Sequence, residues 1–451
     1  MQPDLRTFLK TLKKDHPDQL LTITAETAVE YSSTAVALEL EKQGRYPALL
    51  FERLAGSEVR MAANLFASRA VIAAGLGIQA AQFSKHFGRC LDNLVPSRKV
   101  ESGPVHEQVF EGDQINLGNL PVPLHFLDDA GPYITAGMIA SRDPDSGVGN
   151  LAYARLQIKG PRRMGVSLHS RQHLWDHHRR AAQAGKDLPV AVVIGAHPAV
   201  MLAAAAKMGI GEDEYDLAGA LLGQPLEVCQ ARTVDVDVPA HAEIVIEGHI
   251  LANTEETEGP FGEYTGYTTG RSTNNVLEVT AITMRSDAIF VDIVPGNSSD
   301  HLTLGRAAKE AWVHKLMQEA LPFYQELYYP SSGTHFHCYI QIDKSAEGQA
   351  KQAAQLVMGL DHYIKLAVIV DKDIDPSDEA AVLWAMATRM QADSDVDILS
   401  NLMCNRLDPS SHDGVGAKMI IDATELLNAT ARRVVLPEEA ERLAKDMLSK
   451  E

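Results

Sequence analysis

The first hundred residues alternate between helix-like and strand-like patterns of apolar positions. Apolar residues three and four positions apart predict helices, and short apolar or alternating runs predict strands. The expected elements are a helix over 5–12, a strand over 20–24, a helix that is capped by Ser32 or Ser33 and ends near Gly44, a strand over 47–51, and an alanine-rich helix over 62–80. This order predicts an α/β domain.

From about residue 134 to residue 300 the pattern changes to alternating, strand-like runs. The expected strands cover 134–141, 151–158, 164–168, 191–195, 242–250 and 276–294, the last with a turn at 284–287. A middle domain rich in β-structure follows from this pattern.

After Pro330 strands and helices alternate again, which predicts a second α/β domain. Its expected strands cover 337–343 and 366–370, and its expected helices cover 346–360 and 382–390. Beyond Pro437 one apolar stripe marks a terminal helix that docks on its own domain or on a neighbouring subunit. The predicted division is residues 1–110, 111–310 and 311–435, followed by the terminal helix over 436–451.

Composition and charge narrow the class of protein. A chain of 451 residues with 45% hydrophobic residues is long enough for two or three packed domains. The formal net charge of -19 argues against a general binder of nucleic acid or anionic membranes. Four scattered cysteines suggest neither a disulfide framework nor a thiolate zinc site. Without a signal peptide or a membrane span in the pattern, we expect a cytoplasmic protein.

One loop stands out chemically, the run Thr257-Glu-Gly-Pro-Phe-Gly-Glu-Tyr-Thr-Gly-Tyr267. Its glutamates, Glu258 and Glu263, are separated by Gly-Pro-Phe-Gly, which cannot continue a helix, so both acids lie on a tight loop. Acids among aromatic residues suit a partly apolar pocket in which desolvation favours the neutral carboxyl. A surface turn with two solvated acids is the alternative.

Further polar residues are candidates for binding an anion or a metal. Asn150 and Arg155 flank an expected strand, and we place Asn150 in the turn before it. Arg155 suits a substrate carboxylate or a glutamate, although a surface ion pair would also explain it. Glu214 lies in an acidic loop before a helix, and His169 ends a strand. An amide, an imidazole and a carboxylate would together suit Mn²⁺ or Mg²⁺.

Other motifs are assigned to structure. The histidines from His173 to His178 are expected on a solvated helix face, because neighbouring arginines would repel a cation. His335 and His337 share a strand face but have no evident third ligand. Neither a dinucleotide fingerprint nor a P-loop is present in the sequence.

With these residues in chain order, the sequence resembles the UbiD family of decarboxylases, which use prenylated FMN. The resemblance spans nearly the whole chain, and its most specific motif is Glu-Gly-Pro-Phe-Gly-Glu followed by Thr-Gly-Tyr. Further matching motifs are Pro47-Ala-Leu-Leu-Phe-Glu52, Asn64-Leu-Phe-Ala-Ser-Arg69, Asp373-Ile-Asp375, Val382-Leu-Trp-Ala385, Thr388-Arg389 and Gly416-Ala-Lys-Met-Ile-Ile-Asp-Ala-Thr424.

The resemblance implies a role for each candidate. Arg155 would hold the substrate carboxylate, Glu258 would orient Arg155, and Glu263 would deliver the proton that replaces CO₂. The resemblance also implies that Asn150, His169 and Glu214 hold a divalent metal, Mn²⁺ or Mg²⁺, at the cofactor phosphate, with K⁺ nearby. The implied cofactor-binding residues are Asn150, Tyr153, Ala154, Arg155, Leu168, His169 and Glu214. Two residues depart from the family's pattern: Ala154 stands where the family often has a bulky residue, and Ala380 stands where some members carry a lysine.

For the fold, the resemblance implies a central split β-barrel between two α/β domains, with the terminal helix in a homodimer or larger homo-oligomer. For the activity, it implies reversible, non-oxidative decarboxylation through a covalent adduct with prenylated FMN supplied by a flavin prenyltransferase. The expected substrate is an α,β-unsaturated or (hetero)aromatic acid such as a pyrrole, furan, indole or hydroxybenzoate acid. His301, Asn405 and Arg406 are candidate residues of the pocket wall.

Two alternatives to an active decarboxylase stay open. One is an accessory flavin-binding subunit of a carboxylase complex, and the other is a metal hydrolase without flavin.

Overall fold

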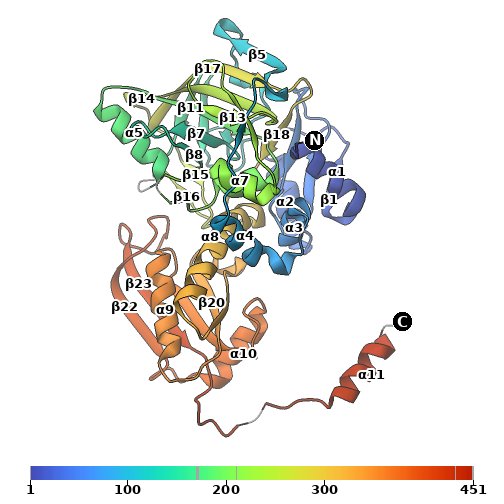
Figure 1. The fold of residues 1–451 in the computed structure, drawn as a ribbon, viewed down its shortest axis with the longest axis vertical. Helices are drawn as coiled ribbons and strands as arrows, with labels where there is room; N and C mark the ends of the chain where they lie inside the picture. Colours follow the sequence, from blue (N-terminus) through green and yellow to red (C-terminus); the bar gives the residue numbers. More distant parts are fainter. Residues whose placement is uncertain (1, 169–171, 210, 432, 449–451) are drawn as a thin grey trace.

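The computed structural model describes residues 2–168, 172–209, 211–431 and 433–448. Figure 1 shows a large body that contains the N-terminal and middle parts of the chain, and a smaller C-terminal body below it. The long helix α8 (Ser299–Ala320) runs from the first body into the second. Both bodies contain helices and strands, as the mixed α/β class expected from the sequence requires.

A four-stranded sheet forms the N-terminal part. Its order is β1 (Leu20–Ile23), β2 (Ala48–Phe51), β3 (Arg60–Ala63) and β18 (Ile289–Asp292). The helices of this part are α1 (Leu5–Asp15), α2 (Ser32–Lys42), α3 (Arg69–Leu76) and α4 (Phe83–Asp92). The last strand comes from the distant run at 276–294, because β18 pairs in parallel with β3. Two chain segments more than 200 residues apart thus share one sheet.

Two sequence expectations in this part are wrong. The expected helix over 62–80 begins only at Arg69, because residues 62 and 63 belong to β3, a turn follows, and Ser68 accepts a hydrogen bond from the N–H of Val71 as the helix cap. The helix cap at Ser32 or Ser33 is absent, since Tyr31 precedes the helix and makes no side-chain cap.

A nine-stranded sheet forms the centre of the molecule. Eight strands follow the order β6-β9-β10-β17-β14-β11-β7-β8, and β5 pairs with β17. Their bounds are β5 (Gln108–Glu111), β6 (Tyr133–Ile134), β7 (Met138–Arg142), β8 (Gly149–Tyr153), β9 (Leu156–Gly160), β10 (Arg163–Val166), β11 (Leu188–Ile194), β14 (Ile244–Glu255) and β17 (Asn275–Met284). Small sheets join β4 (Arg98–Lys99), β12 (Glu227–Gln230) and β13 (Asp237–Pro239), and also β15 (Phe261–Gly262) and β16 (Thr268–Thr269).

The two ends of the large sheet lie close together at residues 154 and 155, a place named here the seam, as the chain connectivity shows. β8 and β9 lie at or near opposite ends of the strand order, yet β8 ends at Tyr153 and β9 begins at Leu156. Three residue steps of chain span at most about 11 Å. The sheet must therefore curl until its two ends lie close together, and residues 154 and 155 bridge them.

The helices of the central part are α5 (His173–Gln183), α6 (Pro198–Ala204) and α7 (Glu214–Leu222). The expected solvated histidine face on α5 is wrong for two residues. His177 is 5% exposed and shares a hydrogen bond with Ser141, while His178 is 9% exposed and lies 3.1 Å from the carbonyl oxygen of Leu251. They face inward because α5 packs against the large sheet.

The C-terminal body is a five-stranded sheet with a helix on each face. The strand order is β19 (Tyr324–Tyr328), β20 (His337–Ile342), β21 (Leu366–Asp371), β23 (Val415–Asp422) and β22 (Val396–Met403). Helix α9 (Gln349–Leu360) contributes to one hydrophobic cluster, and α10 (Glu379–Arg389) contributes to another. Helix α11 (Glu438–Leu448) lies apart from both bodies at the end of an extended stretch and has no buried residue (Figure 1).

Candidate active site

Arg155 lies at the seam of the large sheet, between the last residue of β8 and the first residue of β9. The sequence predicted one continuous strand over 151–158 and placed Asn150 in the preceding turn. Instead, Asn150 is the second residue of β8, and the strand is broken after Tyr153. This break removes the strand alternation that would have sent Asn150 and Arg155 to opposite faces.

The structure brings Arg155 together with both loop glutamates. Its Nε donates to Glu258 Oε1 and its Nη2 to Glu258 Oε2, both at 2.9 Å, which is a bidentate pair. Its Nη1 donates to Glu263 Oε1, and its Nη2 also donates to the carbonyl oxygen of Arg271 at 2.8 Å. Four of the five guanidinium N–H groups are thus used. One N–H on Nη1 has no acceptor within the part of the chain that the structure describes.

Burial makes this cluster unlike a surface salt bridge. The side chains of Arg155 and Glu263 are each 10% exposed, and that of Glu258 is fully buried. Burial alone lowers the pKa of Arg155, but the hydrogen bonds and charges of the two glutamates outweigh burial and raise that pKa above its ordinary value. The guanidinium is therefore a fixed cation, and Phe261 lies 5.1 Å from it across the ring face.

The surroundings of Glu258 leave little room for movement. Its backbone N–H donates to Asn274 Oδ1 at 3.1 Å. A Cβ added at Gly165 on β10 would lie 3.0 Å from Glu258 Cγ and 2.8 Å from Lys159 Cε, so the glycine permits a close approach. The carboxylate that orients Arg155 is thus held through its backbone, its charge and its packing.

A second group of polar residues lies against β8. Glu214, at the start of α7, is 4% exposed and accepts a hydrogen bond from the backbone N–H of Leu151 at 2.7 Å. Burial raises its pKa to about 8 and raises the pKa of the neighbouring Asp213 to about 6. Asn150 Nδ2 is buried without a hydrogen-bond partner among the described residues.

This arrangement fits a bound cation. Glu214 is buried and Asp213 is half-buried, and neither makes an ion pair with a side chain in the described ranges, so a divalent metal would compensate their charge. His169, the third expected ligand, lies outside the described residues. No group of three or more His, Cys, Asp or Glu side chains among the described residues is arranged to hold a metal. The metal site therefore stays a prediction.

The remaining expected cofactor-binding residues are Tyr153, the last residue of β8, Ala154, which follows it, and Leu168, which lies beyond the end of β10. Tyr153 donates from its hydroxyl to the carbonyl oxygen of Met201 at 3.2 Å, and Ala154 is buried. The backbone N–H of Leu168 donates to Thr273 Oγ1 at 2.7 Å. These contacts show where the residues lie; no cofactor contact follows from them.

Pocket-wall candidates lie where the glutamate loop meets the C-terminal body. Tyr264 follows Glu263 directly, and its ring contacts those of His301, His335, Phe336 and Tyr363. Asn405 is 6% exposed, and its side chain forms a hydrogen bond with Tyr363. Sequence patterns missed Tyr363 because nothing in its local run marks it.

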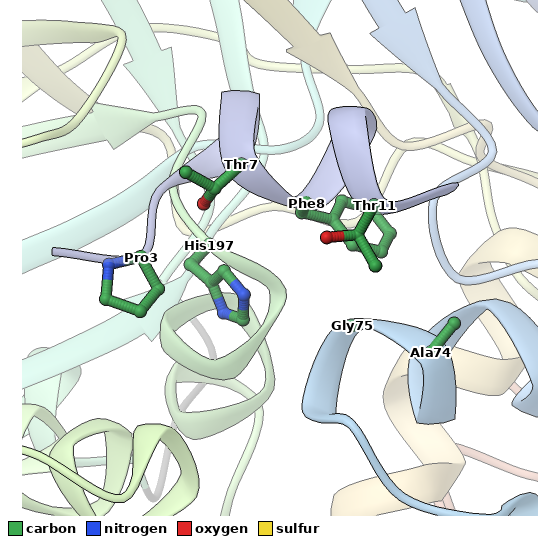
Figure 2. A pocket seen from close by; sticks show the side chains of 7 residues that line it. All are labelled: Pro3, Thr7, Phe8, Thr11, Ala74, Gly75 and His197. Atoms are coloured by element: carbon green, nitrogen blue, oxygen red, sulfur yellow. The ribbon is translucent and has the colours of Figure 1, made fainter. Parts of the chain in front are cut away.

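A cavity of about 260 Å³ lies elsewhere, between α1, α3 and the start of α6. Figure 2 shows the side chains of Thr7, Thr11 and His197 around it. His197 accepts a hydrogen bond from Ala199 N on its Nδ1, and burial lowers its pKa to about 4. No residue of the Arg155 cluster lines this cavity.

Comparison with known proteins agrees with this geometry over nearly the whole chain. Three family profiles match in succession, described as the N-terminal domain (residues 12–91), the Rift-related domain (98–298) and the C-terminal domain (302–423) of 3-octaprenyl-4-hydroxybenzoate carboxy-lyase. The phenolic acid decarboxylase of Bacillus subtilis (strain 168) is 32% identical over 93% of this chain and 92% of its own length.

Solved structures give the same result. The UbiD-class enzyme HmfF from Pelotomaculum thermopropionicum in complex with FMN superposes with a TM-score of 0.92, at 40% identity, over 98% of this chain and 100% of that one. An evolved dimeric form of that enzyme in complex with prFMN superposes with a TM-score of 0.88, at 37% identity, over 97% and 98%.

The fold and the consecutive domain matches define a carboxy-lyase, that is, an enzyme of the decarboxylase class. The chain belongs to the UbiD family. None of the described helices is long and apolar enough to cross a membrane.

Proposed function

We propose that this enzyme removes CO₂ reversibly and without oxidation from an aromatic, heteroaromatic or α,β-unsaturated acid, with prenylated FMN as cofactor. One observation carries the proposal: a buried guanidinium lies between two carboxylates and retains one free N–H donor among the described contacts. A relative named phenolic acid decarboxylase and a neighbour that binds prFMN support the substrate class and the cofactor.

Arg155 would bind the carboxylate of the substrate. The free N–H on Nη1 is the first available donor, and the Nη1 bond to Glu263 is the one that a second carboxylate would replace. Glu258 would stay in place, because its bidentate pair uses Nε and Nη2 instead. Substrate binding would thus separate Glu263 from Arg155 without disturbing the orientation of the guanidinium.

Glu263 would then act as the acid. A carboxylate that loses its cationic partner in a site shielded from water takes up a proton more readily. Glu263 is 8% exposed, so few water molecules would compensate for the lost partner. The neutral side chain could place a proton on the carbon that has lost CO₂. When bound, prenylated FMN supplies the electron acceptor that side chains lack.

Asn150, Glu214 and His169 would hold a Mn²⁺ or Mg²⁺ ion at the cofactor phosphate, with K⁺ nearby. The support is the buried Glu214 carboxylate, which makes no ion pair among the described residues and lies with Asp213 next to the buried Asn150 on β8. The split β-barrel is proposed from the curled sheet whose ends meet at Arg155. The domain division at residues 110, 310 and 435 is proposed on the spans of the three family profiles.

The direct test is to co-express the chain with a flavin prenyltransferase. The purified protein should carry prenylated FMN, detected by its absorbance and mass, and should release CO₂ from at least one acid in a panel of pyrrole, furan, indole, cinnamic and hydroxybenzoic acids. Deuterium from the solvent should appear at the carbon that lost the carboxylate. Flavin-loaded protein that releases no CO₂ from any of these acids would favour an accessory subunit, and CO₂-independent hydrolysis by colourless protein would favour a hydrolase.

Replacing Glu214 with glutamine should remove metal-dependent flavin retention. The neutral amide keeps the size of the side chain but weakens binding of a divalent cation by at least about 10-fold to 100-fold, the loss that is typical for removing a group that only hydrogen-bonds to a metal ligand. Metal and flavin per chain are measured by mass spectrometry and absorbance after dialysis against Mn²⁺. Glu212→Gln is the matched control, because Glu212 is an exposed acid in the same loop that accepts from Gly209 N. Equal metal and flavin contents in the two variants would contradict the assigned ligand.

Deleting residues 437–451 should change the oligomeric state. Helix α11 has no buried residue, although its apolar residues Leu443, Met447 and Leu448 are 61–74% exposed. An apolar stripe of this kind is stabilised by contact with another surface, which supports a homodimer or larger homo-oligomer. Light scattering should show a multimer for the full chain and a smaller species for the truncated one. An Arg442→Ala variant, altered within the same helix but outside the apolar stripe, should keep the multimer.

A further inference from the structure

Residues 126–133, named here the support segment, lie against the loop that carries Glu258 and Glu263. Its Asp-Ala-Gly-Pro run, residues 129–132, is typical of a loop between elements. In the structure the segment ends in β6, whose Tyr133 pairs with Gln157 of β9, two residues after Arg155. The support segment thus lies next to both halves of the candidate active site.

Backbone and carboxylate hydrogen bonds tie the support segment to the glutamate loop. Asp129 Oδ1 accepts from the N–H of Gly262 at 2.8 Å, and Asp129 Oδ2 accepts from the N–H of Phe126 at 3.0 Å. The N–H of Ala130 donates to the carbonyl oxygen of Pro260 at 2.8 Å. Gly262 directly precedes Glu263, so Asp129 fixes the backbone from which the proposed proton donor extends. The bonds to Gly262 and Pro260 each bridge segments that are about 130 residues apart in the chain, whereas the bond from Phe126 holds the Asp129 carboxylate within the support segment.

Tyr133 supports the other end of the loop. Its side chain is fully buried, and its ring lies 4.6 Å from that of Phe261, which in turn lies against the Arg155 guanidinium. Its hydroxyl donates to the carbonyl oxygen of Pro260 at 3.4 Å and is also near the Glu258 carboxylate, which together with burial raises the pKa of the tyrosine. One side chain therefore contacts the residues under the cation and the carboxylate that orients it.

The Phe126 ring of the support segment packs closely against the glutamate loop. A Cβ at Gly262 would lie 2.5 Å from the Phe126 ring, and a Cβ at Gly296 would lie 2.7 Å from the same ring. Contacts this short do not occur in folded proteins, so the two glycines allow the Phe126 ring to lie directly against the backbone. The loop is thus confined by packing as well as by hydrogen bonds.

We propose that Asp129 and Tyr133 are positioning residues that hold Glu263 and Glu258 in register with Arg155. Neither touches the reacting atoms, and the catalytic consequence rests on the proposed function. Because a displacement of about 1 Å at a reacting group can cost on the order of 100-fold in rate, loosening this support should lower turnover without removing a catalytic group.

The test uses the flavin-loaded full chain with the variants Tyr133→Phe, Asp129→Asn and Asp129→Ala. Tyr133→Phe removes one hydroxyl and keeps the ring, whereas Asp129→Asn keeps one of two acceptors and Asp129→Ala removes both. The matched control is Asp128→Ala, since Asp128 is the adjacent, exposed acid. Four quantities are measured: kcat, KM, flavin per chain, and hydrogen–deuterium exchange of the peptide that covers residues 258–263.

We expect kcat to fall about 10-fold to 100-fold in the order Asp129→Ala, then Asp129→Asn. KM should change much less, flavin should stay bound, and exchange of the 258–263 peptide should accelerate. Tyr133→Phe should lower kcat with an unchanged melting temperature. A merely structural role would instead lower the melting temperature and leave kcat per folded, flavin-loaded chain unchanged.

Two results would overturn the proposal: kcat within twofold of wild type in all three variants, or a loss as large in Asp128→Ala. If the wild-type protein releases no CO₂, the proposed function fails, yet the exchange measurement still decides the inference. Faster exchange at 258–263 in the Asp129 and Tyr133 variants then supports the positioning role, and unchanged exchange rejects it. Should Asp129→Ala fail to fold, Asp129→Asn and Tyr133→Phe carry the test.

Discussion

Replacing Glu263 with glutamine should reduce CO₂ release by about 10²-fold to 10⁴-fold, the range expected for the loss of a general acid. Glutamine has nearly the same shape, and its amide oxygen can still accept from Arg155 Nη1 as Glu263 Oε1 does. The variant should therefore keep its fold and its flavin but lack an acid that exchanges a proton. CO₂ release and solvent deuterium incorporation are measured on the flavin-loaded protein, and both should fall together.

The matched control for this variant is Glu256→Gln. Glu256 is an acid in the same segment, but it pairs with Arg163 at 2.7 Å on a surface where both side chains are more than one-third exposed. Removing that pair should leave turnover near the wild-type rate, because exposed ion pairs contribute little. Full activity in Glu263→Gln, or an equal loss in Glu256→Gln, would show that Glu263 does not deliver the proton.

Replacing Arg155 should damage both turnover and stability. In Arg155→Ala the fully buried Glu258 carboxylate loses its described cationic partner, and removing one member of a buried pair costs about 3–5 kcal/mol. The proposed clamp for the substrate carboxylate disappears in the same variant. We expect CO₂ release to become undetectable, the melting temperature to fall and the flavin content to decrease.

Replacing Arg155 with lysine tests whether the positive charge alone is enough or whether the geometry of the guanidinium is also needed. A lysine keeps a cation near Glu258 and Glu263, but one ammonium cannot reproduce the bidentate pair and also reach the carbonyl oxygen of Arg271. We expect most of the stability to return while turnover stays at least about 100-fold below wild type, because the reacting groups are misplaced. Arg163→Ala, on the neighbouring exposed pair, is the control. Near-normal turnover in Arg155→Lys would mean that charge alone suffices at this position.

Local patterns predicted the elements well where one periodicity dominates. The helix at the start of the chain, the strand over 366–370 and the helix before Asp361 all appear within a few residues of their expected bounds. The alanine-rich run over 62–80 is α-helical only from Arg69 to Leu76, because pairing of β3 with β2 and β18 overrides the helix propensity of residues 62 and 63. The histidines of α5 failed because burial depends on the sheet that the helix covers.

For the candidate site, too, the sequence predicted some features and only the tertiary structure decided others. Sequence spacing placed Glu258 and Glu263 on one loop, and the family resemblance added Arg155 from about 100 residues upstream. Spacing could not show that Arg155 bridges the two ends of a curled sheet, since strand pairing between distant segments decides that position. Asn150 was placed in a turn for the same reason: the break after Tyr153 has no local signal.

By itself, then, the sequence determined the chemistry: which acids share a loop, which cation the family pattern pairs with them, and which domains follow one another. Tertiary structure decided the geometry. Pairing of distant strands in the large sheet places Arg155 beside the loop, and Asp129 and Tyr133 fix that loop through contacts across more than 120 residues. Such contacts form only when the whole chain packs, because their strength depends on burial and direction, which no short run of residues specifies.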